Sequence, residues 1–76
     1  MKLIYEIWKL DKETFRINLN SKHLLEELCK KYDKTVSNYY YKNGKSISWD
    51  LTFEKKYKTD VYLDVKQFIK NDKKKS

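Results

Sequence analysis

The sequence contains no proline and only one glycine, one cysteine and one histidine among its 76 residues. A single cysteine cannot form an intramolecular disulfide, and one cysteine with one histidine cannot supply the ligands of a structural zinc site. A single glycine excludes a glycine-rich phosphate-binding loop. No apolar run approaches the ~20 residues of a membrane span, and the amino-terminal stretch lacks the features of a signal peptide. These absences favour a reducing, intracellular setting.

Groups that could catalyse a reaction are equally scarce. A chain of this length buries only about 60% of its unfolded surface, which leaves no room for a deep enzyme cleft. His23 has no second ligand or base at a suitable spacing and is interpreted as a surface histidine. Cys29 is interpreted as a small buried side chain, and the adjacent Glu26 and Glu27 would point apart on a helix. We therefore expect no enzymatic activity, no cofactor and no metal.

The formal net charge of +7 is unevenly distributed along the chain. Lysine is abundant and arginine occurs once. AT-rich codon usage alone would produce this composition on any solvated surface. Residues 1–29 are nevertheless neutral overall, whereas residues 30–58 carry a net charge of +5 and the tail from Lys70 carries +3. Clustered positive charge of this kind is typical of phosphate binding.

The pattern of apolar residues predicts an α+β fold with a small antiparallel sheet. Leu3–Leu10 is rich in β-branched and aromatic residues, and Thr14–Leu19 alternates between apolar and polar side chains, so both are predicted strands. Lys22–Tyr32 carries leucines at helical spacing behind Ser21, a good N-cap, and is a predicted helix. Lys58–Val65 is the best candidate for a further strand.

The chain is predicted to form one domain. That domain covers residues 1–69, and a short helix capped by Asp64 would close it. Residues 70–76 are predicted to be a basic, disordered tail, since charged chain ends are seldom tied down.

The segment Asp33–Trp49 has two incompatible interpretations. Asn43-Gly44 between runs rich in Tyr, Val and Ile is a strong hairpin signal, and propensity favours strands there. Alternation, however, gives neither side of such a strand a purely apolar face. A helix would gather Val36, Tyr39 and Tyr40 on its inner side, with Gly44 as the C′ residue that ends it. The helix is the working prediction and the hairpin is the alternative.

The stretch "SKHLLEELCKKYDKTVSNYYYKNGKSI" resembles the helix-turn-helix of small Firmicute prophage proteins built as strand–strand–helix–turn–helix–strand. It is also similar to the short DNA-binding modules appended to intron-encoded homing endonucleases. Ser21 matches the cap, Thr35–Asn38 the start of the recognition helix, and Asn43–Lys45 its end. Two features depart from the pattern: the turn lacks its usual glycine, and the spacing from Leu28 to Val36 is one residue longer.

This resemblance implies a cytoplasmic, prophage-encoded protein of a bacterial host that binds double-stranded DNA, with no membrane association. Residues 34–45 would enter the major groove, Asn38 and Lys34 would contact base edges, and Ser37 and Tyr41 would contribute hydroxyl groups. A homodimer would supply two half-sites. The predicted phosphate contacts are Lys30, Lys31, Lys42, Lys45, Lys55 and Lys56.

Two further functions remain open from the sequence. The first is a phage-encoded inhibitor that binds a host enzyme or a defence ribonucleoprotein, as anti-CRISPR proteins do, through a rigid hairpin surface with tyrosine anchors. The second is binding of single-stranded DNA or RNA through Tyr41 and the neighbouring lysines. A recognition helix would favour duplex DNA, whereas a hairpin over residues 33–49 would favour the other two.

Overall fold

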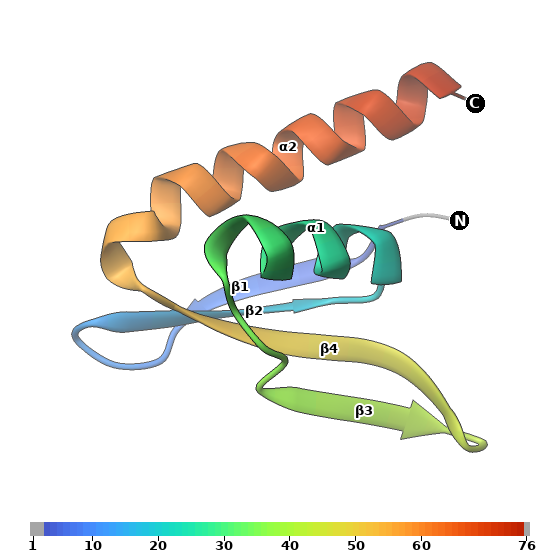
Figure 1. The fold of residues 1–76 in the computed structure, drawn as a ribbon, viewed down its shortest axis with the longest axis horizontal. Helices are drawn as coiled ribbons and strands as arrows, with labels where there is room; N and C mark the ends of the chain where they lie inside the picture. The colour runs from blue at the N-terminus through green and yellow to red at the C-terminus, as the bar shows by residue number, and fades with distance from the viewer. Residues whose placement is uncertain (1–2, 76) are drawn as a thin grey trace.

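The structure is a computed structural model that describes residues 3–75, excluding the side chains of residues 72–75 (Figure 1). Its elements, in chain order, are the strands and helices β1 (Tyr5–Lys9), β2 (Thr14–Leu19), α1 (Lys22–Tyr32), β3 (Asn38–Lys42), β4 (Lys45–Glu54), the single 3₁₀ turn η1 (Lys55–Tyr57) and α2 (Lys58–Lys75). The predicted α+β class with a small antiparallel sheet is confirmed. No helix in the described part of the chain is both long and apolar enough to cross a membrane.

The four strands form one antiparallel sheet in the order β1-β2-β4-β3. Because β2 and β3 both lie antiparallel to β4, they run in the same direction on either side of it. A connection between parallel strands must cross the sheet, and α1 makes that crossing. Both helices lie on the same side of the sheet (Figure 1). The side without helices is called the open face below.

The hydrophobic core lies between the sheet and the two helices. It is built from every second residue of the two central strands and from the inner sides of the helices. Its members are Phe15, Ile17, Leu19, Leu24, Leu25, Leu28, Trp49, Leu51, Phe53, Val61 and Val65. The alternation of Phe15, Ile17 and Leu19 is the pattern that predicted β2, and all three side chains are buried.

Helix α1 begins and ends as its sequence dictates. The Ser21 hydroxyl accepts a hydrogen bond from the Leu24 amide at 3.2 Å, which confirms the predicted N-cap. Asp33 ends this helix: its φ of 53° lies in the left-handed region and its amide donates to the Cys29 carbonyl. The chain therefore leaves α1 toward the sheet rather than into another helix.

The predicted helix over residues 34–45 is wrong, because this segment contains the first strand and the turn of a β-hairpin. Asn43 and Gly44 have φ values of 54° and 77°, the two positive angles that a two-residue type I′ turn requires. Strand β3 has no apolar face, and none of its five residues is buried. Its register is instead imposed by β4, whose Trp49, Leu51 and Phe53 alternate into the core. Tyr39 and Tyr40, predicted to be core residues, are consequently exposed.

The predicted strand Lys58–Val65 is also wrong, because it is the first part of α2. Val61 and Val65 are fully buried, whereas Leu63 between them is 58% exposed. In a strand these three side chains would lie on one face and all be buried. The buried side chains instead recur every four residues, as in a helix, and this pattern continues to Ile69. Helix α2 extends through Lys75, into the tail that was predicted to be disordered; Ser76 lies outside the described residues.

Candidate binding surface at the β3–β4 hairpin tip

The residues predicted to contact DNA do not form one surface. Lys45 begins strand β4 and Lys55 follows its last residue, so the extended strand separates them by about 33 Å. Tyr41, Lys42 and Lys45 lie at the hairpin tip. Ser37 and Asn38 lie where β3 begins. The remaining lysines belong to the opposite end of the molecule, near the end of α1 and the start of α2; they are Lys30, Lys31, Lys34, Lys55 and Lys56.

Most lysines at that opposite end are held by the protein itself. The Lys31 ammonium donates to both carboxylate oxygens of Asp64, at 2.8 and 3.1 Å. The Lys34 ammonium donates to Glu54 at 2.7 Å and is the largest cause of the lowered pKa of that carboxyl. The Lys56 ammonium lies 5.1 Å from the centre of the Tyr57 ring. These contacts stabilise the fold and compete with phosphate for the same charges.

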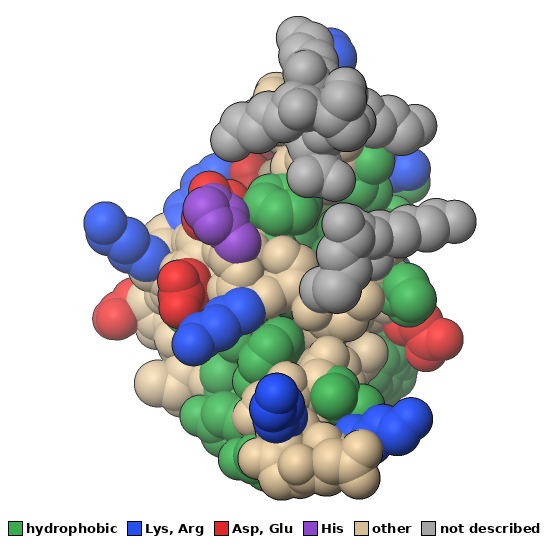
Figure 2. All heavy atoms as spheres, turned by 90° about the vertical axis from the view of Figure 1, so that its right-hand side faces the viewer, with side chains coloured by type: hydrophobic (Ala, Val, Ile, Leu, Met, Phe, Trp, Pro, Cys, Tyr) green, Lys and Arg blue, Asp and Glu red, His purple; other side chains and the backbone are tan. Residues whose placement is uncertain are grey.

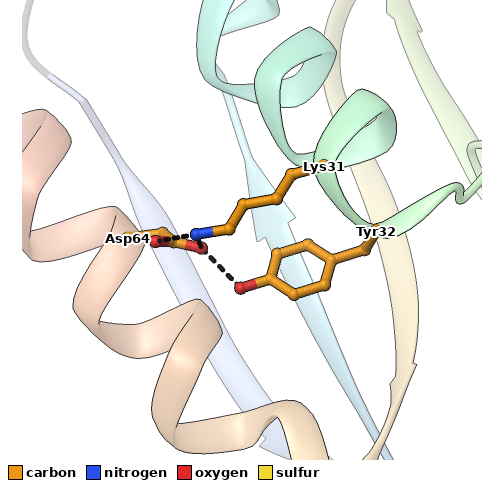
Figure 3. A network of polar contacts seen from close by, with 3 residues as sticks. All are labelled: Lys31, Tyr32 and Asp64. Carbon is orange, nitrogen blue, oxygen red and sulfur yellow. Dashed lines mark hydrogen bonds and ion pairs between the residues drawn. The ribbon is translucent and has the colours of Figure 1, made fainter.

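Figure 3 shows how Asp64 of α2 joins the end of α1. The Tyr32 hydroxyl donates to an oxygen of this carboxylate at 2.5 Å, next to the Lys31 ammonium. Burial, followed by this hydrogen bond, raises the pKa of Tyr32, so its hydroxyl stays protonated as a donor. The tyrosine ring packs edge-on against Phe53 and Tyr57. The cluster therefore fixes the angle between the helices and is structural.

Asn38, the predicted contact to a base edge, belongs to a hydrogen-bonded network around the buried Asp50 on the open face. Its amide donates to Asp50 at 3.1 Å, and the same carboxylate accepts from Asn18 at 2.9 Å and from the Tyr40 hydroxyl at 2.7 Å. Ser37 shares a hydrogen bond of 2.9 Å with Thr52. Neither side chain is presented on a helix that could enter a groove.

The Asp50 carboxylate is charged although its side chain is only 1% exposed. Burial is the largest single influence and raises its pKa. The hydrogen bonds from Asn18, Tyr40 and Asn38, together with the charge of Arg16, outweigh that effect and hold the pKa below its ordinary value. The network therefore binds β2, β3 and β4 together from the open face.

The hairpin tip presents a different kind of surface on the side of the sheet that carries the helices. We call it the hairpin-tip surface, and its residues are Lys22, Tyr39, Tyr41, Lys45, Ile47 and Trp49. Tyr39 lies opposite Trp49 in the register, beyond the part of the sheet that α1 covers. The exposed fractions of Tyr39, Tyr41 and Ile47 are 55%, 63% and 47%.

Two features make this surface suited to an aromatic anion. The rings of Tyr39 and Tyr41 lie side by side, with centroids 6.2 Å apart and planes 21° from parallel. Beside them is an open hollow of about 810 Å³, whose lining includes Lys22, Lys45 and Trp49. Residues 34–49 contain three lysines and no Asp or Glu. Figure 2 faces this end of the molecule and shows lysine and hydrophobic side chains next to one another in its lower part.

Four members of this surface were not among the predicted contacts: Lys22, Tyr39, Ile47 and Trp49. Tyr39 was assigned to the core of a helix, and Lys22 and Ile47 received no role. The signal that would have revealed the hairpin is Asn43-Gly44, but a regular hairpin closed there would place Tyr39 opposite Ser48. The register shift between Tyr40 and Tyr41 moves Tyr39 opposite Trp49 instead. Lys22 is 17 residues away from Tyr39 in the chain, and only the crossover of α1 brings it to the same place.

The other candidates for chemistry are isolated. His23 is exposed and lies 3.2 Å from Glu27, which fits the predicted surface histidine. Cys29 is half-buried, and burial raises the pKa of its thiol. Within residues 3–71, whose side chains are described, no group of three His, Cys, Asp or Glu side chains is arranged to hold a metal ion. No family model matches the chain, and comparison with curated proteins and with solved structures gives no match.

Proposed function

We propose that this protein is a non-catalytic binding module that takes single-stranded nucleic acid on its hairpin-tip surface. The observation that carries the proposal is the pair of exposed, nearly parallel rings of Tyr39 and Tyr41 beside Lys45 and Lys22. Aromatic faces stack on unpaired bases and lysines contact the phosphates, and this combination is the usual means of binding single strands without a fixed sequence.

Single strands are favoured over duplex DNA for a geometric reason. The element expected to enter the major groove is a strand of a hairpin, and the two helices of the described chain pack on the sheet through their apolar sides. The bases of a duplex are stacked on each other, so their faces are closed to Tyr39 and Tyr41. Each base stacked on an aromatic side chain contributes about 1–3 kcal/mol by alanine substitution.

A specific observation supports a second candidate, contact with another protein through the open face. Trp8 and Arg16 lie opposite each other in the register of β1 and β2, and Tyr40 lies on the same face. Trp, Tyr and Arg are the residues most enriched at the energetic centres of protein interfaces. Trp8 is 37% exposed and Tyr40 is 44% exposed. The predicted role as an inhibitor of a host enzyme or defence complex would use this face.

The first experiment is an anisotropy titration of labelled single-stranded RNA, single-stranded DNA and duplex DNA, at two salt concentrations. Single strands should bind more tightly than duplex, and raising the salt should weaken binding steeply. Tyr41→Ala should reduce affinity about 5- to 100-fold. Tyr62→Ala, which removes a comparably exposed tyrosine from α2, should leave it unchanged.

Two results would reject the proposal. One is equal binding of duplex and single strands, with no effect of Tyr41→Ala. The other is no binding to any of the three at low salt. The second result would direct attention to the open face and to a search for a protein partner.

A further inference from the structure

Strand β3 forms an edge of the sheet that natural proteins seldom leave unprotected. It is the last strand in the order β1-β2-β4-β3, so one side of its backbone is unpaired within the sheet. Every residue from Asn38 to Lys42 is exposed. Edge strands are normally shielded by proline, by inward-pointing charge or by a covering helix. This strand has no proline and a single charge, at its far end.

The sequence of β3 is complementary to itself when two copies run antiparallel. With the twofold axis at Tyr40, Tyr39 of one copy lies opposite Tyr41 of the other, and Asn38 lies opposite Lys42. Aromatic residues directly opposite each other are favourable cross-strand pairs, and like charges directly opposite are unfavourable. This register pairs all five residues, and it keeps the two Lys42 side chains about 14 Å apart.

From this complementarity we propose that two copies of the chain pair through β3 and form one continuous eight-stranded sheet. A twofold axis perpendicular to the sheet leaves both helical layers on the same side. Tyr39 and Tyr41 already share that side with Trp49 in each copy. Pairing therefore joins two hairpin-tip surfaces into a single cluster of four tyrosines, in which Tyr39 of each copy lies opposite Tyr41 of the other.

The tyrosine cluster rests on the proposed function for its ligand, and it suits a longer single strand than one copy does. Each side of the cluster is flanked by the Lys22 and Lys45 of one copy. The pairing itself brings together two chains of net charge +7, and their repulsion opposes it. Salt screens that repulsion and a bound polyanion neutralises it, so both should strengthen the pairing.

Disulfide trapping tests the pairing and its register without any ligand. In a Cys29→Ser background, Tyr40→Cys should crosslink to its own copy, because directly opposite Cα atoms lie about 5 Å apart. Tyr39→Cys alone should crosslink poorly, since the Cα atoms of this residue in the two copies lie about 8 Å apart across the twofold axis. A mixture of Tyr39→Cys and Tyr41→Cys should form the mixed dimer in severalfold higher yield. Glu6→Cys, on the opposite edge strand β1, is the matched control.

Sedimentation of the unmodified protein provides the second measurement, which does not depend on any variant folding. With a single strand of about 12 nucleotides, the complex should contain two chains. Monomers at all concentrations with one chain per oligonucleotide, or crosslinking from β1 equal to that from β3, would overturn the pairing while leaving single-strand binding intact. Crosslinking in the expected register without nucleic-acid binding would support the pairing and reject the proposed function.

Discussion

At the scale of single residues, Asp50 has the most demanding environment among the described side chains. Among the residues whose side chains are described it is the only charged one that is buried, and three donors from β2 and β3 converge on it. Asp50→Ala should lower the free energy of unfolding by about 2 kcal/mol, because three part-buried hydrogen bonds lose their acceptor. Ser48→Ala, on the same strand and face, should change it by less than about 0.5 kcal/mol. Urea denaturation followed by circular dichroism measures both.

The same residue should make stability depend on pH on the acid side. Because the pKa of Asp50 is lower in the folded protein than its ordinary value of 3.8, its ionised form favours folding. That contribution is fully present above about pH 4 and is lost as the pH falls through the folded pKa. The wild type should therefore lose more stability than Asp50→Asn between about pH 6 and pH 2.

The comparison with the variant isolates this residue. The pKa values of Asp11 and Glu54 are also lowered, through backbone and lysine hydrogen bonds respectively, but those effects are common to both proteins. Parallel pH profiles for the wild type and Asp50→Asn would show that Asp50 does not contribute to the acid transition.

At the scale of elements, the turn between β3 and β4 determines whether the hairpin-tip surface exists. Gly44 has a φ of 77°, and a Cβ built there would meet no atom within 4 Å. Gly44→Ala should therefore destabilise only through backbone strain, by about 1 kcal/mol. Gly44→Asn should cost less, because asparagine tolerates this conformation. Thermal denaturation gives the ranking, and an equal loss in both variants would instead indicate a steric cause.

The junction of the two helices provides a second prediction at this scale. Tyr32→Phe retains the ring contacts with Phe53 and Tyr57 but removes the donor to Asp64. We expect a loss of about 1 kcal/mol in unfolding free energy, at the lower end for a hydrogen bond to a charged group because Lys31 still pairs with Asp64. Tyr41→Phe, which has no such partner, is the control. Chemical denaturation would measure the difference.

The elements that the sequence predicted well are those whose signal is local. The alternation in β2 and the Ser21 cap with its leucines each specify one structure within a few residues. The hairpin was misassigned because β3 has no apolar face of its own. The apolar residues that fix its register belong to its partner β4, a strand of ten residues. In α2, Val61 and Val65 fit both a strand and a helix, and only packing against the core distinguishes them. The site was partly missed for the same reason, since Lys22 reaches Tyr39 through tertiary structure.

At the scale of the whole molecule, the positive charge falls into two groups with different roles. Three of the five lysines near the α1–α2 junction, Lys31, Lys34 and Lys56, contact Asp64, Glu54 and Tyr57 respectively. The hairpin tip has lysines beside tyrosines in a segment without acidic residues. A net charge of +7 therefore does not act as a uniform attraction for phosphate. Under the proposed function, the lysines at the hairpin tip attract the phosphates of the bound strand, and those at the other end of the molecule do not.

Two matched substitutions test this division of charge. Lys45→Ala and Lys55→Ala each remove one exposed lysine, one at each end of β4, so they change the net charge equally. If the hairpin tip binds single strands, Lys45→Ala should weaken binding and reduce the slope of log K against log salt by about 0.7, the value for one phosphate contact. Lys55→Ala should leave the slope unchanged. Equal small effects from both lysines would mean that net charge, rather than the hairpin-tip surface, attracts the nucleic acid.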